Sequence, residues 1–187
     1  MTHDWRWKID EAVKRIQERY AYVGSKTGAS LLAVVYPPEV ETAVFHEWSA
    51  QTARLGPQYD LQTIDVLAVT TEKVAELGSE HIVAAIADPM PGSNPEADLG
   101  RMWVTAVAQQ IHTRLDQSHK ERPVAVLQNV AALYPATTPR ALLQTLWDNP
   151  KPLRGPVIIF IPGQLIEQRV YAFLNKEHEL MYRGDII

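Results

Sequence analysis

The chain contains no cysteine among its 187 residues, which excludes disulfide bonds, thiolate zinc sites and cysteine nucleophiles. Long apolar runs are also absent. Runs such as Leu31–Tyr36 and residues 157–161 are far shorter than the roughly 20 residues that a membrane-spanning helix needs. The opening residues lack an apolar core followed by a small-residue cleavage site, so we expect no secretory signal. Together these absences predict a cytoplasmic protein with no membrane segment.

Positive charge does not exceed negative charge, because 18 lysines and arginines face 22 aspartates and glutamates. The formal net charge of -4 gives no global positive field that would attract a phosphate backbone, so direct nucleic-acid binding is not expected. What the chain does have is a globular composition, with 46% hydrophobic and 21% charged residues. Its length predicts one domain that spans residues 1–187.

Short apolar runs alternate with segments of helical spacing along the chain. The runs Leu31–Tyr36 and residues 157–161 have no polar alternation, which is typical of central strands that are covered on both faces. Further strands are expected at residues 60–67 and 124–127, and helices at residues 5–22, 37–55, 70–77, 102–115 and 137–147. This alternation predicts a three-layer α/β fold with a mostly parallel sheet and helices on both faces. The architecture would be P-loop-type or Rossmann-like.

Two segments are harder to assign from their residues. Residues 88–100 hold three prolines and two glycines, which predicts a flexible internal loop. Residues 165–174 are densely apolar and aromatic, and we interpret them as a helix.

A phosphate-binding loop is not expected, although Gly24 and Gly28 flank a lysine and two hydroxyl residues. A P-loop follows a strand, whereas these glycines precede the strand Leu31–Tyr36. The turn after that strand contains Pro37 and Pro38, which remove two amide donors. The α/β fold is therefore predicted without a phosphate-binding loop.

Other catalytic and metal-binding patterns are missing as well. The six histidines are scattered and form no helical pair of the zinc-binding kind, and no Gly-x-Ser-x-Gly elbow is present. Asp60, Asp65 and Asp88 are candidates for the carboxyl ends of strands, where we expect them to cap helices or turns. We therefore predict no catalytic residue, no metal and no cofactor.

Aromatic residues near the two ends of the chain are the candidates for partner binding. Trp5 and Trp7 are two positions apart, about 200° around a helix, so one helix face cannot bury both. Near the other end, Arg169, Tyr171 and Phe173 combine aromatic and charged residues as interfaces do. We predict that these five residues contact a partner protein.

Three segments in order resemble the BrxB family of BREX phage-defence systems, formerly a domain of unknown function. They are residues 31–41, residues 127–135, and residues 155–163 leading to Tyr182 and Arg183. The chain departs from the family pattern after its Pro-Gly turn, where it lacks a longer insertion, and in its last residues.

The resemblance implies a non-enzymatic adaptor that works beside a methyltransferase, a large ATPase and the phosphatase-like protein PglZ, with PglZ as the direct partner. It carries over no catalytic residue. The alternative is a nucleotide-dependent enzyme or regulator with a non-standard site at the carboxyl ends of the strands.

Overall fold

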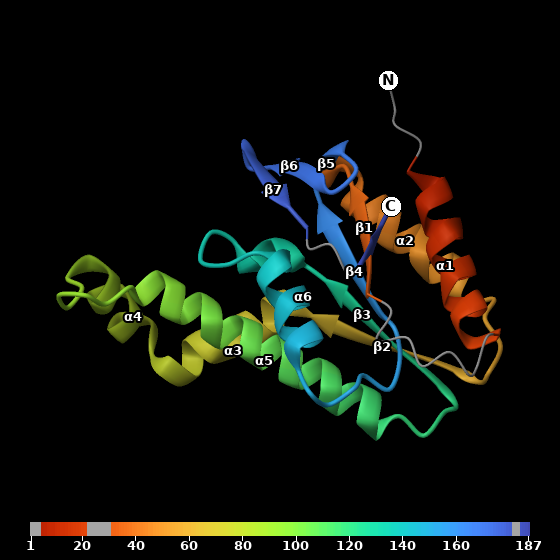
Figure 1. The fold of residues 1–187 in the computed structure, drawn as a ribbon, viewed down its shortest axis with the longest axis horizontal. Helices are drawn as coiled ribbons and strands as arrows, with labels where there is room; N and C mark the ends of the chain where they lie inside the picture. Colours follow the sequence, from red (N-terminus) through yellow and green to blue (C-terminus); the bar gives the residue numbers. More distant parts are fainter. Residues whose placement is uncertain (1–4, 22–30, 181–183) are drawn as a thin grey trace.

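A five-stranded parallel sheet forms the middle of the protein, with helices on both of its faces (Figure 1). The computed structural model describes residues 5–21, 31–180 and 184–187. The strands, in the order β2-β3-β4-β1-β8 across the sheet, are β2 (Tyr59–Asp65), β3 (Arg122–Gln128), β4 (Val157–Pro162), β1 (Leu31–Tyr36) and β8 (Asp185–Ile186). The predicted three-layer α/β fold is confirmed.

Strands β1 and β4 pair in register along their whole length, from Leu31 opposite Val157 to Tyr36 opposite Pro162. Every residue of both strands is buried. Alternate side chains point to opposite faces, so that Leu32 contributes to one core and its neighbours to the other. Because both faces are covered, no position favours a polar residue, which explains the two continuous apolar runs.

One face of the sheet is covered by α1 (Arg6–Ala21) and α2 (Glu41–Thr52), the latter after a short 3-10 turn, η1 (Pro38–Val40). Phe160 of β4 is central to this core. The rings of Tyr36, Phe45 and Trp48 meet it edge to face, with centroids 5.1 to 6.3 Å away. The rings of Phe45 and Trp48 thereby fix α2 on the sheet.

The other face is covered by α3 (Val66–Leu77), α5 (Pro95–Gln117) and α6 (Pro139–Asp148), with η2 (Val130–Leu133) beside them. Gly100 brings α5 close to the loop before α6, because a Cβ there would lie 2.4 Å from the Ala136 carbonyl oxygen. Near the other end of α5, the buried His112 imidazole lies 3.1 Å from the Asn149 side-chain amide.

Residues 164–179 form an antiparallel meander, so the predicted helix at 165–174 is wrong. Its strands are β5 (Gln164–Glu167), β6 (Val170–Phe173) and β7 (Lys176–Glu179). Leu174 and Asn175 join β6 to β7 with φ values of 52° and 58°, the two successive positive values of a tight hairpin turn. The meander lies beyond the carboxyl end of β4 (Figure 1).

The predicted loop at 88–100 is only partly correct, because its second half is helical. Asn94 caps α5 by accepting a hydrogen bond from the Ala97 amide at 3.1 Å, and Pro95 occupies the first turn, where proline is favoured. A further helix, α4 (Ser79–Ala87), precedes this segment and was not predicted.

Candidate protein-interaction surface

The structure separates the two N-terminal tryptophans that the sequence identified as partner-binding. Trp5 is only 7% exposed and belongs to the core formed with α1 and α2. Trp7 is 51% exposed, and the Lys8 ammonium lies over its ring at 5.7 Å from the centroid. Trp5 is therefore a core residue, which corrects its assignment as a contact residue. Trp7 stays a predicted contact.

The three predicted contact residues near the other end attach the meander to its own domain. Tyr171 is fully buried, and its hydroxyl forms a hydrogen bond with the Tyr134 hydroxyl. The Phe173 ring meets the Tyr134 ring edge to face at 5.1 Å. Arg169 donates a hydrogen bond to the Gly184 carbonyl at 3.0 Å. The buried Tyr171 is not available to a partner, because its own domain already covers it.

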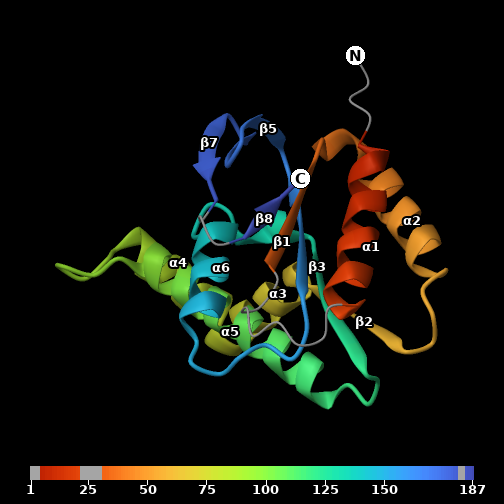
Figure 2. The same cartoon turned by 45° about the vertical axis from the view of Figure 1, so that its right-hand side comes forward.

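A different region has the exposed apolar surface. We call residues 72–102 the helical arm: the end of α3, all of α4 and the start of α5. In two views α4 projects away from the sheet and its two helical layers (Figure 1 and Figure 2). No residue of α4 is buried, and every residue from 83 to 94 is exposed. Five of the nine exposed large hydrophobic residues of the described chain lie on the arm: Leu77, Val83, Ile86, Met90 and Met102.

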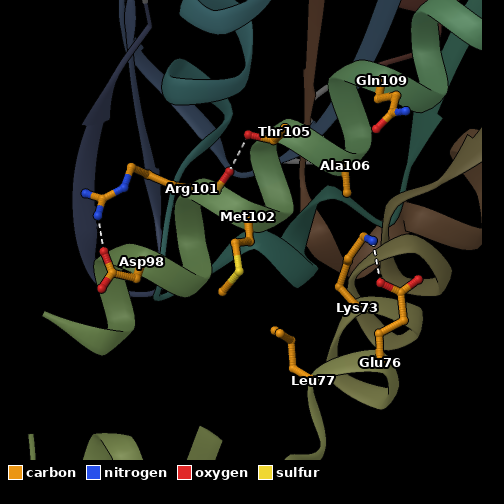
Figure 3. A pocket seen from close by; sticks show the side chains of 9 residues that line it. All are labelled: Lys73, Glu76, Leu77, Asp98, Arg101, Met102, Thr105, Ala106 and Gln109. Carbon is orange, nitrogen blue, oxygen red and sulfur yellow. Dashed lines mark hydrogen bonds and ion pairs between the residues drawn. The ribbon is translucent and has the colours of Figure 1, made fainter.

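Two hollows meet on the helical arm. One, of about 450 Å³, lies between α3 and α5. The other, of about 310 Å³, lies between α4 and the start of α5. Leu77, Asp98 and Met102 line both hollows. Leu77 and Met102 point into the space between α3 and α5, and the ion pairs of Lys73 with Glu76 and of Arg101 with Asp98 lie beside it (Figure 3). Leu77 and Met102 thus form an apolar floor of the hollow, and the charged side chains of the two ion pairs lie at its sides.

The base of the arm is firmly attached to the sheet. The Asp65 carboxylate caps α3 by accepting hydrogen bonds from the Leu67 amide at 3.0 Å and the Ala68 amide at 3.4 Å. The same oxygen accepts a third hydrogen bond, from the Asn129 side chain at 2.9 Å. Leu99 of α5 is buried. The arm is thus held at both of its connections while its outer surface is uncovered.

Of the three aspartates predicted to cap helices or turns, Asp60, Asp65 and Asp88, one does so with its side chain. Asp65 is a helix cap, whereas the Asp60 carboxylate accepts hydrogen bonds from Ser118 at 2.5 Å and Gln62 at 2.7 Å. The Ser118 hydroxyl is the main cause of the lowered pKa of Asp60. Asp88 follows the last turn of α4, and its amide donates to the Ala84 carbonyl.

The carboxyl edge of the sheet, where the alternative hypothesis places a nucleotide, is occupied in part by the protein itself. The Gly163 amide donates to the Tyr36 carbonyl at 2.8 Å, which closes the meander over the ends of β1 and β4. A Cβ at Gly163 would lie 2.8 Å from the Ala172 carbonyl oxygen.

Within the described ranges, no group of three or more histidine and acidic side chains could hold a metal ion. The glycine-rich segment that resembled a phosphate loop lies outside the residues that the structure describes.

Sequence reasoning missed the helical arm, although one signal was present. Residues 82–87 are six consecutive apolar residues, yet the run is too short to distinguish a helix from a strand. Over the described part of the chain, no helix has the length and apolarity to cross a membrane. Comparison with known protein families and with curated proteins finds no match for this chain.

Proposed function

We propose that this protein is a non-enzymatic adaptor that binds another protein through the helical arm. The observation that carries the proposal is the exposure of α4. Its six consecutive apolar residues, 82–87, lie on a helix that buries none of its residues against its own domain. A helix of that composition is normally covered, and contiguous exposed apolar surface marks interaction sites. The firmly attached base supports the same role, because a pre-organised surface loses little entropy on binding.

We further propose that the adaptor belongs to a BREX phage-defence system and binds its PglZ protein, beside the methyltransferase and the large ATPase. The resemblance of three segments to the BrxB family supports this assignment. Two of them contain the central strands of the sheet, β1 and β4, and the other contains η2. Tyr182 and Arg183, at the end of the third segment, lie outside the described residues.

Co-purification with a PglZ-like protein from the same genome tests the proposal. The double variant Val83→Ser/Ile86→Ser removes two exposed apolar side chains that are three residues apart on one face of α4. The matched control, Ile166→Ser/Leu174→Ser, removes two exposed apolar side chains of the meander. We expect the wild type and the control to retain the partner and the α4 variant to lose at least about 90% of it, since truncation of central interface anchors costs about 2 kcal/mol or more.

Circular dichroism of all three proteins shows whether they fold alike. Equal recovery of the partner by the α4 variant would place the interface elsewhere. Failure of the wild type to retain any PglZ-like protein would overturn the BREX assignment.

A further inference from the structure

The excess of negative over positive charge in the chain lies on the helical arm. Residues 72–102 contain six acidic and two basic side chains, a balance of -4, which equals the net charge of the complete protein. The remaining residues are therefore balanced, with 16 basic and 16 acidic side chains. The most exposed apolar surface and the excess negative charge thus occupy the same part of the molecule.

The two basic side chains of the arm do not offer their charge to a partner. Lys73 is paired with Glu76, and Arg101 with Asp98. Four other acidic residues of the arm form no ion pair within the described residues: Glu72, Glu80, Asp88 and Glu96. The apolar side chains of Leu77 and Met102 thus lie on an arm with an excess of carboxylates, and Asp88 lines one of the two hollows together with them.

We infer that the helical arm binds a basic amphipathic helix of its partner protein. This inference rests on the proposed adaptor function and names the chemistry of the partner's segment. The apolar face of such a helix would cover Leu77, Ile82, Met90 and Met102, which line the two hollows, and its lysines and arginines would meet the carboxylates of the arm. Grooves between helices take amphipathic helices through anchors at positions i, i+3, i+4 and i+7. Methionines such as Met102 adapt their shape to the anchors that they receive.

The same charge argues against the other common occupants. A phosphate backbone or an anionic membrane surface would be repelled by the excess of -4 on this surface. A second copy of the arm, placed face to face, would bring two such surfaces together. Addition of an extended peptide to a sheet requires a strand edge, and the described structure of the arm is helical between its turns.

A binding assay with three synthetic peptides of roughly 18 residues, about five helical turns, tests the inference. The first peptide has leucines on one helical face and lysines on the other. The second replaces every lysine with glutamate, and the third scrambles the lysine–leucine sequence. Fluorescence anisotropy with the full chain should show binding of the first peptide, at least about tenfold weaker binding of the scrambled peptide, and still weaker binding of the acidic one. Added salt should weaken the binding of the first peptide.

Two double variants locate the peptide on the arm. Leu77→Ser/Met102→Ser removes apolar contacts in both hollows, and Glu80→Lys/Asp88→Lys reverses charge. We expect each double variant to raise the Kd at least about tenfold, or 1.4 kcal/mol. The meander control, Ile166→Ser/Leu174→Ser, should leave the Kd unchanged. Equal binding of the basic and acidic peptides, or an unchanged Kd in both arm variants, would overturn the inference.

The peptide assay and the co-purification assay can each overturn one hypothesis without overturning the other. If no peptide binds while the PglZ-like protein still depends on Val83 and Ile86, the adaptor function stands and the basic-helix inference is wrong. If the basic peptide binds at the arm while the PglZ-like protein does not depend on it, the proposed partner is wrong. Concentration-dependent self-association that the α4 variant abolishes would identify a second copy as the occupant and overturn the inference.

Discussion

Replacing each N-terminal tryptophan by alanine should have very different effects on stability, although the two residues are neighbours in the sequence. Trp5 is 7% exposed in the core shared with Ile9 and Trp48, whereas Trp7 is 51% exposed. A buried tryptophan removes roughly 150 to 250 Å² from water, which at about 25 cal/mol per Å² corresponds to about 4 to 6 kcal/mol. Measured substitutions of buried aromatic residues by alanine cost about 3 to 5 kcal/mol.

We therefore expect Trp5→Ala to lower the free energy of unfolding by about 3 to 5 kcal/mol and the Tm by roughly 6 to 20 °C. Trp7→Ala should cost about 1 kcal/mol or less, because its main described ring contact is the Lys8 ammonium. Urea unfolding followed by circular dichroism measures both values. Equal losses in the two variants would refute the assignment of Trp5 to the core and Trp7 to the surface.

Three further predictions concern other parts of the fold. Gly100→Ala should destabilise the protein by about 1 to 3 kcal/mol in urea unfolding, because the new Cβ would meet the Ala136 carbonyl oxygen at 2.4 Å. An unchanged unfolding midpoint would mean that α5 can move away from the loop before α6. Burial, and next the charge of Lys151, lower the pKa of His112, so the folded state favours the neutral imidazole. The free energy of unfolding should therefore decrease as the pH falls from about 6.5, the pKa of an ordinary histidine, to the lower pKa of His112 in the folded state. His112→Gln should flatten this dependence, and the same slope in the variant would assign it to another group. Burial raises the pKa of Tyr171 to about 12, so Tyr171→Phe should remove one late-ionising tyrosine from an alkaline absorbance titration, which an identical curve would contradict.

The central strands could be predicted because their environment leaves a direct trace in the sequence. Burial on both faces of β1 and β4 excludes polar residues and gives continuous apolar runs. Their pairing could not be predicted, since Leu31 lies opposite Val157 and such distant partners leave no local signal. Likewise, helical geometry indicated that Trp5 and Trp7 cannot share a face, but not which of them is buried.

The meander and the helical arm escaped prediction for different physical reasons. Residues 165–174 are apolar at positions that fit either a helix or short strands, and the turn at Leu174 and Asn175 has no glycine to mark its positive φ values. In the arm, the prolines of residues 88–100 indicated a loop, yet Pro95 stands in the first turn of α5, where proline favours a helix. The proposed interaction surface was missed because its apolar residues belong to three separate helices that only the fold brings together.

The pairing of β1 also has a consequence for the newly made polypeptide. Translation produces the six apolar residues Leu31–Tyr36 long before Val157–Pro162, the strand beside which they are finally buried. Strands β2, β3 and β4 can meanwhile associate in the order in which they emerge, because they are neighbours in the sheet. Until β4 is complete, β1 is an unpaired, aggregation-prone segment, so the yield of native protein in the cell should depend on chaperones that bind this strand during synthesis.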